Sequence, residues 1–153
     1  MVHSHLSYCI NIYGCANQTS LNSLKLKQKA AIRVVCNAGH RDHTNPLFKQ
    51  SGILPLNELI KYSNLKFMHK FSHKNLPLSF HEMWTTNRER NPNIALRNAG
   101  NLYVPAHNYA TLKRLPLFAF PKVWNEDTNL KENPSPRLYL KSVKSALLNS
   151  IVV

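Results

Sequence analysis

Apolar residues between positions 56 and 72 recur with the period of an α-helix, and this pattern constrains the fold more than any other feature of the chain. They form one stripe of about four turns, made by Leu56, Leu59, Ile60, Phe67, Met68 and Phe71 with Ser63 in register. A helix with such a stripe must bury it, because packing supplies most of the stability of a helix in a protein. The segment predicts a core helix, and with it a mainly α-helical fold.

The segment 21–37 predicts a second long helix. The polar residues 17–20 are able to cap its start, and Gly39 stands where a left-handed residue is wanted after its last turn. Its apolar side chains fall mainly on one helical face, which we expect to be buried: Leu21, Leu24, Ala31, Val34 and Val35. Basic residues recur at four-residue spacing on another face, so the helix combines an apolar side with a cationic ridge.

Two shorter helices are predicted from their first residues. Asn45 followed by Pro46 makes a cap and a first helical position for a helix that ends near Gly52. Ser135 followed by Pro136 makes the same pair for a C-terminal helix. That last helix contains both apolar and basic residues: Leu138, Leu140, Val143, Leu147 and Leu148 together with Arg137, Lys141 and Lys144.

The region between the core helix and the last helix is less regular. Residues 85–101 are polar and basic and predict a linker, whereas 102–104 and 117–120 predict short extended pieces that nearby prolines restrict to edges. The sequence therefore predicts a helical lobe over 1–84, a basic polar linker over 85–101, and a small extended region followed by a basic C-terminal helix over 102–153. The predicted fold class is mainly α with a small extended or β region before the C-terminal helix.

The charge of the chain indicates a polyanionic partner. There are 20 Lys and Arg against 7 Asp and Glu, which gives a formal net charge of +13. Such an excess is typical of proteins that bind nucleic acid, so RNA or DNA is the first candidate. The alternative is a basic protein whose charges only face solvent.

Nine basic residues are the candidate contacts to a nucleic-acid backbone. They lie in three groups: Lys25, Lys27, Lys29 and Arg33 in the predicted second helix, Arg88, Arg90 and Arg97 in the polar segment, and Lys113 and Arg114 near Tyr109. Lysine and arginine bind phosphate oxygens, and a neighbouring tyrosine can stack on a base. The Lys25, Lys29 and Arg33 ridge can address neighbouring phosphates.

Catalytic and metal chemistry find little support in the sequence. The chain has two aspartates, Asp42 and Asp127, far apart, whereas metal-dependent phosphoryl transfer needs clustered carboxylates. Two incomplete sets of possible metal ligands occur, Cys36 with His40 and His43, and His69 with His73. The simpler interpretation is that His69 and His73 flank a basic surface. We therefore predict no catalytic residue, no metal site and no cofactor.

The cellular setting is predicted from cysteine use and hydropathy. Three cysteines without a Cys-x-x-Cys pair are typical of reduced thiols in an intracellular protein. No apolar run approaches the length of a membrane span, and a signal peptide is not indicated. We expect a nuclear or cytoplasmic protein without a membrane partner.

Several short motifs follow one another in a recognisable order. Tyr8 and Gly14 come first, then the basic helix and glycine stop of 24–39, then His-Thr-Asn-Pro-Leu-Phe at 43–48, and finally Val-Trp-Asn at 123–125 before the Ser-initiated basic helix. This order resembles the C-terminal region of jockey-like LINE-type (non-LTR) retrotransposon reverse transcriptases, over nearly the whole chain. The chain departs from that pattern at Glu126 and Asp127, where a Ser-Leu-Pro-like step usually follows.

The resemblance implies a terminal piece of a larger polyprotein, an RNA-directed DNA polymerase. The polymerase palm and the endonuclease would lie upstream, and the 1–84 lobe would continue from a thumb-like region. The expected function is a non-catalytic, sequence-tolerant module that binds RNA or DNA backbone, with the upstream polymerase domain as its other partner. The alternatives are a structural or protein-interaction segment that only packs on the polymerase core, and a decayed genomic copy without function.

Overall fold

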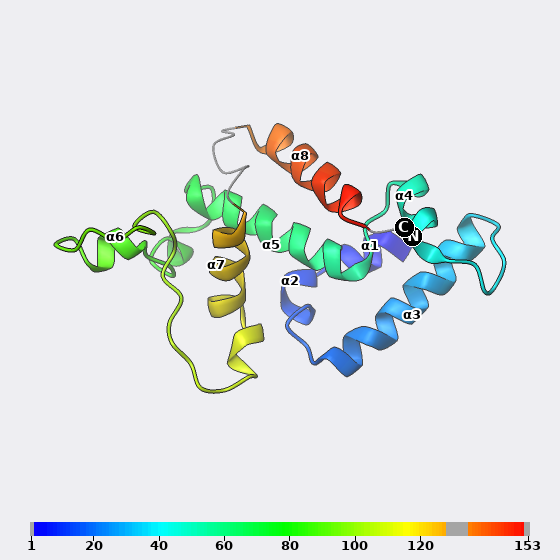
Figure 1. Cartoon of the computed structure of the whole chain (residues 1–153), viewed down its shortest axis with the longest axis horizontal. Helices are drawn as coiled ribbons and strands as arrows, with labels where there is room; N and C mark the ends of the chain where they lie inside the picture. Colours follow the sequence, from blue (N-terminus) through cyan, green and yellow to red (C-terminus); the bar gives the residue numbers. More distant parts are fainter. Residues whose placement is uncertain (1, 128–134, 152–153) are drawn as a thin grey trace. The chain divides into compact units, whose positions relative to one another are not determined.

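The computed structural model of the chain is mainly α-helical, which confirms the predicted fold class (Figure 1). It describes residues 2–127 and 135–151. Its helices are α1 (Val2–Ser7), α2 (Ile10–Tyr13), α3 (Gln18–Val35), α4 (Thr44–Ser51), α5 (Leu56–Ser72), α6 (Asn87–Arg90), α7 (Pro116–Glu126) and α8 (Pro136–Asn149), with 3-10 turns η1 (Leu78–Phe80) and η2 (Leu112–Arg114). Within these described ranges the extended structure is limited to an isolated bridge between Thr86 and Leu102. None of the described helices has both the length and the apolar character needed to cross a bilayer.

The chain divides into two compact units. Unit 1 comprises Met1–Ser63 and Leu140–Val153, and unit 2 comprises Asn64–Tyr139. The predicted boundaries at 84 and 101 do not coincide with this division, because α5 and α8 each supply residues to both units. Positions 128–134 and 152–153 of the predicted C-terminal region, and position 1 of the predicted lobe, lie outside the described residues.

The ends of α3 show one correct and one wrong prediction. Its N-cap is Asn17, whose side chain accepts a hydrogen bond from the Ser20 amide at 2.8 Å, as the polar cluster predicted. At its C-terminus the left-handed residue is Asn37, with φ of 49°, and not Gly39. The Ala38 amide closes this turn by donating to the Arg33 carbonyl at 2.9 Å. Asparagine tolerates the left-handed region, so the helix ends two residues earlier than a glycine stop implies.

The buried face of α3 differs from the predicted one. Leu21, Gln28 and Ile32 are its buried residues, and at about 100° per residue they lie within about 40° of one another. Val34 and Val35 are 82% and 72% exposed, so their predicted burial is wrong. Val34 lies on the far side of the helix, and Val35, its last residue, borders a small apolar hollow in unit 1.

The core of unit 1 joins α3, α4 and the end of the chain. Ile32, Phe48 and Ile151 are its buried centre, and partly buried Cys36, Leu47, Ile53 and Leu148 pack around them. Helix α4 packs against α3 and begins after His43, two residues earlier than the predicted cap at Asn45. Its last residue is Ser51, so the predicted end near Gly52 is confirmed. Gly52 is the C-cap, and its φ of 63° lies in the left-handed region that favours glycine.

Helix α5 has the bounds that its apolar stripe predicts. Leu56, Leu59 and Met68 of that stripe are buried, whereas Ile60, Phe67 and Phe71 are half-buried. In unit 2 the stripe carries an aromatic cluster: the Phe67 ring lies 5.6 Å from Phe80, 6.2 Å from Trp84 and 5.4 Å from Phe120 between ring centroids. These edge-on and tilted contacts are the preferred geometries for aromatic rings, and buried Trp84 and Phe120 make this cluster part of the core of unit 2.

Of the expected extended piece at 102–104, the structure has only the bridge residue Leu102. Its partner on one side is the segment after Trp84, since the Tyr103 amide donates to the Thr85 carbonyl at 2.8 Å. On the other side a single side chain takes the place of a strand: the Asn125 amide donates to the Leu102 carbonyl at 2.8 Å and accepts from the Leu102 amide at 2.9 Å. The backbone groups of Leu102 are thereby satisfied without a β-ladder.

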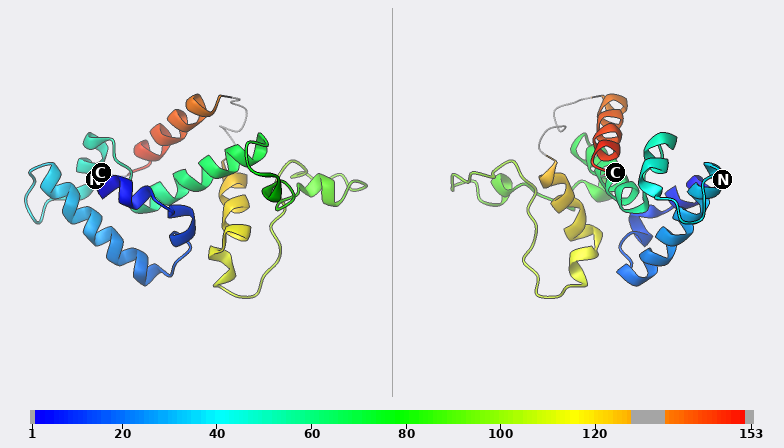
Figure 2. Two further views of the ribbon diagram at one scale, coloured as in Figure 1. Left: turned by 180° about the vertical axis from the view of Figure 1, so that it is seen from behind. Right: turned by 45° about the vertical axis from the view of Figure 1, so that its right-hand side comes forward.

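The predicted extended piece at 117–120 is wrong, because it is the first half of α7 (Figure 2). Pro116 occupies the first helical position, where a missing amide costs nothing, but Pro121 lies inside the helix. Pro121 has no N–H for the carbonyl of Leu117, four residues earlier. The indole N–H of Trp84 donates to that carbonyl instead, at 3.0 Å. This external donor explains how a helix with an internal proline forms here.

We expect the Trp84 indole and the missing amide of Pro121 to be energetically coupled. Trp84→Phe removes the donor and leaves the Leu117 carbonyl without it, so unfolding free energy should fall by at least about 1 kcal/mol. Pro121→Ala restores a helical amide, so the double variant should recover about 1 kcal/mol relative to the sum of the single effects. Urea denaturation of the four proteins measures this coupling. Additivity within about 0.3 kcal/mol would show that the indole does not serve the proline gap.

Candidate nucleic-acid interface

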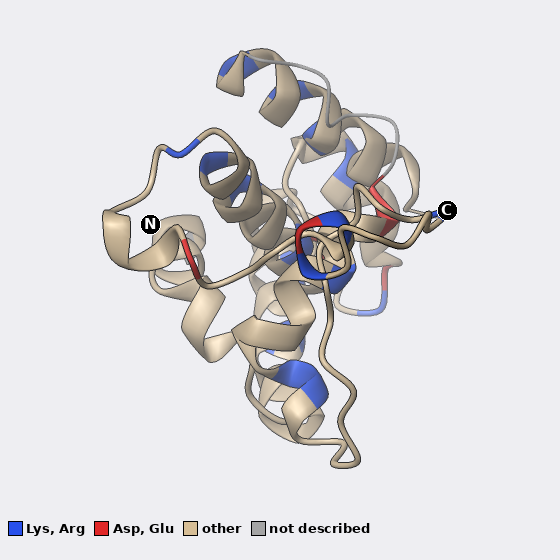
Figure 3. Cartoon of the chain, turned by 90° about the vertical axis from the view of Figure 1, so that its left-hand side faces the viewer, with Lys and Arg blue, Asp and Glu red and all other residues tan. Residues whose placement is uncertain are grey.

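The nine basic candidates are divided between the two units. Helix α3 carries four of them in unit 1, and α6, η2 and the loop between them carry five in unit 2. Figure 3 shows lysine and arginine on several helices and acidic residues at only a few places. Each unit therefore has its own set of basic candidates, and the two sets are described separately.

The basic residues of α3 form a strip along one border of its buried face. At about 100° per residue, Lys25, Lys29 and Arg33 fall within about 80° of one another, whereas Lys27 points to the other side. Lys29 is exposed, and Lys25 and Arg33 are half-buried. The eighteen residues of α3 include no acid. We call Lys25, Lys29 and Arg33 the α3 strip.

A buried glutamine orients the α3 strip. The Gln28 amide donates to the Leu54 carbonyl at 3.0 Å, and its oxygen accepts from the Leu56 amide at 2.8 Å. Leu56 is the first residue of α5, whose amide has no partner within its own helix. Because Gln28 is fixed against the backbone, the rotation of α3 about its axis is fixed as well. Lys25 and Lys29, which precede and follow Gln28 in the sequence, are therefore held at the same border of the packed face. Sequence reasoning gave Gln28 no role, although a long amide among lysines at an inward position was a usable signal.

The two lysines of the strip also border a hollow in unit 1. Pro55, Asn57 and Glu58 of the α5 entry line this hollow with Lys25 and Lys29. Glu58 lies in the first turn of α5, where a carboxylate interacts favourably with the helix dipole. Two cations of the strip therefore share this hollow with one carboxylate, that of Glu58.

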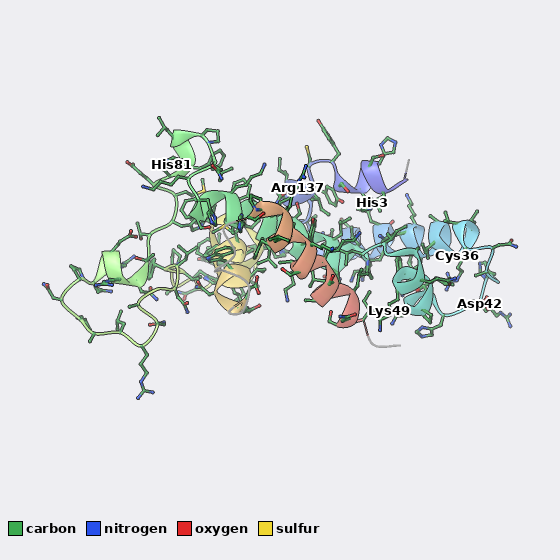
Figure 4. The ribbon with its side chains drawn as sticks, turned by 90° about the horizontal axis from the view of Figure 1, so that it is seen from above. His3, Cys36, Asp42, Lys49, His81 and Arg137 are labelled. Atoms are coloured by element: carbon green, nitrogen blue, oxygen red, sulfur yellow. The ribbon has the colours of Figure 1, made fainter. Side chains whose placement is uncertain are left out.

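Arg33 has a structural contact in addition to its charge. Its Nε donates to the Asp42 carbonyl at 3.0 Å, and the Asp42 carboxylate accepts from the Gly39 amide at 2.7 Å. These two bonds close the loop after α3, where Figure 4 labels Cys36 and Asp42. Asp42 is thus a loop-closing residue, and Arg33 holds that loop against the helix.

The structure does not assemble the cysteine and histidine residues of this loop into a metal site. Cys36 is half-buried, and His40 and His43 are exposed. Across the described ranges 2–127 and 135–151, no three His, Cys, Asp or Glu side chains are placed to hold one metal ion.

The polar segment 85–101 is folded in unit 2. Thr86 and Glu89 form a capping box at the start of α6, in which the Thr86 amide donates to Glu89 Oε2 at 2.7 Å. The Arg88 amide donates to the Ala99 carbonyl at 3.0 Å, so the segment turns back on itself. The Arg90 guanidinium lies 3.8 Å above the centre of the Tyr103 ring. This cation–π contact orients Arg90 and covers one face of Tyr103.

The remaining basic candidates of unit 2 are Arg97, in the turns after α6, and Lys113 and Arg114, in η2. Arg97 and Lys113 are exposed and Arg114 is half-buried. Tyr109 is 71% exposed, so its ring is available for stacking, unlike the covered ring of Tyr103.

The interpretation of His69 and His73 as flanking a basic surface is wrong for His69. Its imidazole is 2% exposed and is stacked on His73 at 4.2 Å and on Tyr139 at 4.3 Å between ring centroids. The Tyr139 hydroxyl donates to the Asp127 carboxylate at 3.0 Å. Burial, followed by the charge and hydrogen bond of Asp127, raises the pKa of Tyr139 well above its ordinary value. This column of rings is a packing element whose tyrosine stays neutral.

Comparison with known proteins yields no relative. No family model, curated protein or solved structure matches the chain. The resemblance to reverse transcriptases therefore rests on the motifs alone.

We call the two hydrogen bonds of Gln28, to the Leu54 carbonyl and from the Leu56 amide, the Gln28 bracket. We expect this bracket to contribute strongly to the stability of unit 1. Gln28→Ala leaves the Leu54 carbonyl and the Leu56 amide without their partner, which should lower unfolding free energy by about 2–3 kcal/mol. Gln50→Ala, at an exposed position of α4, is the matched control and should change it by less than about 0.5 kcal/mol. Guanidinium denaturation measures both. Equal effects of the two substitutions would contradict the bracket.

Proposed function

We propose that this chain is a non-catalytic module that binds RNA or DNA through the sugar–phosphate backbone, without strong sequence preference. The observation that carries the proposal is the α3 strip, because three cations share one border of a helix that contains no acid. Adjacent cations can neutralise successive phosphates and release their counterions. In the setting that the motif order suggests, the module would help a LINE-type reverse transcriptase hold template RNA or target DNA.

The positions of the two aspartates support a role without phosphoryl-transfer chemistry. Asp42 accepts the Gly39 amide in unit 1, and Asp127 accepts the Tyr139 hydroxyl in unit 2. Two-metal catalysis needs carboxylates that meet at one site with lone pairs directed at the ions. Each aspartate of the chain has a structural hydrogen bond within its own unit.

A second candidate function is protein interaction, and exposed apolar residues of unit 1 favour it. Ile12, Val34 and Val35 are each more than two-thirds exposed. Val35 also borders the apolar hollow lined by Leu6, Ala31 and Ile53. In the polyprotein setting these side chains would provide contacts to the upstream polymerase domain. The two functions are compatible, because the α3 strip lies on another side of the helix.

A salt titration separates binding by the α3 strip from binding by net charge. Lys25→Gln with Lys29→Gln removes two candidate phosphate contacts, so the slope of log affinity against log salt for duplex DNA should decrease in magnitude by up to about 1.8. Glutamine preserves helix propensity. The control pair Lys141→Gln with Lys144→Gln removes the same charge from exposed positions of α8 and should leave most of the slope. Fluorescence anisotropy at several salt concentrations measures the three proteins.

Two results would contradict the proposal. Affinity of the unaltered chain that does not depend on salt would exclude backbone binding. Equal losses in the α3 pair and the α8 pair would show that net charge, and not the strip, determines binding.

A further inference from the structure

Unit 2 contains a hollow of about 300 Å³ whose lining includes none of the nine basic candidates. Its walls include the aromatic side chains of Phe71, Trp84 and Trp124, and its polar lining includes Lys74, His81 and Glu89. This volume is at the lower end of ligand pockets in proteins and suits a ligand of one or two rings. Figure 4 labels His81, which lies in the turn after η1.

The hollow is formed by elements that other contacts hold in place. Trp84 is fixed by its bond to the Leu117 carbonyl, and Phe71 packs edge-on against it at 5.1 Å between ring centroids. The next residue after Trp124 is Asn125, whose side chain makes two hydrogen bonds with the backbone of Leu102, another lining residue. A rigid aromatic frame of this kind keeps its shape without a ligand and lowers the entropic cost of binding one.

Glu89 supplies a carboxylate to the lining of the hollow. One of its oxygens receives the Thr86 amide at 2.7 Å, but a carboxylate has about four lone-pair positions and can accept further N–H donors. A phosphate placed against this carboxylate is repelled, whereas Lys74 on the same lining attracts one. A neutral, flat ring with N–H groups on its edge satisfies both the aromatic walls and the acceptor.

The cations near Glu89 indicate where such a ring would come from. Arg88 and Arg90 flank Glu89 in α6, and Lys74 lines the hollow itself. Phosphates on either side of a splayed nucleotide can therefore be held by these cations while its base stacks in the hollow and faces Glu89. Stacking of unpaired bases on aromatic side chains is the common mode of single-strand recognition.

We propose that this hollow binds one unpaired nucleobase, with guanine preferred over adenine. Guanine offers the adjacent N1–H and N2–H donors to the Glu89 carboxylate, a two-point contact, whereas the same edge of adenine pairs one donor with an acceptor. The inference rests on the proposed function, to which it adds a preference for one base at one position. Binding elsewhere on the strand stays sequence-tolerant.

Intrinsic fluorescence reports directly on this site, because both tryptophans of the chain line it. The probes are three RNA pentanucleotides of uridine, with guanosine, adenosine or an abasic ribose at the centre. We expect the guanosine probe to change tryptophan emission and to bind about fivefold or more tightly than the adenosine probe. The abasic probe should bind through its phosphates and alter emission least.

A matched pair of variants tests the role of Glu89. Glu89→Gln keeps a side chain that can form a capping box but loses the carboxylate, so the guanosine preference should disappear. Glu126→Gln, an exposed carboxylate in the same unit and outside the hollow, should retain it. Circular dichroism checks that both variants keep their helix content.

Each outcome decides the proposal. Equal affinity for guanosine and adenosine probes, or a preference that survives in Glu89→Gln, overturns it. Equal affinity for all three probes with unchanged tryptophan emission also overturns it but leaves backbone binding intact. Failure of every probe and of long duplex DNA to bind at low salt would overturn the proposed function as well.

Discussion

In each unit one side-chain amide pairs with a backbone carbonyl and a backbone amide, as a neighbouring β-strand would in a sheet, and both units depend on these hydrogen bonds. Gln28 pairs with the Leu54 carbonyl and the Leu56 amide in unit 1, and Asn125 pairs with both backbone groups of Leu102 in unit 2. Each amide satisfies one donor and one acceptor where the chain leaves regular structure. Buried backbone groups without partners cost about 1–3 kcal/mol each, so these brackets allow a helical chain to carry irregular connections.

The same brackets position the surfaces to which we assign function. Gln28 fixes the rotation of α3, and this rotation places Lys25 and Lys29 at the border of the packed face while Lys27 points away. Asn125 holds Leu102 at the wall of the aromatic hollow, and Trp84 reaches the Leu117 carbonyl that Pro121 leaves open. Packing constraints and candidate binding groups are thus neighbours in sequence, which makes binding sensitive to fold stability.

The helices were predictable where local signals act alone, and not where distant residues decide. The bounds of α5 follow from its stripe, and the cap at Asn17 follows from residue type. The helix over 116–126 was missed because its internal proline is tolerated only through Trp84, more than thirty residues earlier. The basic candidates were identifiable by composition, but the structural contacts of Arg33 and Arg90, and the role of Glu89, depend on backbone that no sequence pattern places.

Residue-resolved lysine acetylation with and without RNA shows which lysines contact the nucleic acid. We expect that a saturating single-stranded RNA protects Lys25 and Lys29 from the reagent, that added salt removes the protection, and that Lys141 and Lys144 of α8 stay reactive throughout. Uniform protection of all lysines, or continued reactivity of Lys25 and Lys29 in the bound state, would contradict backbone binding by the α3 strip.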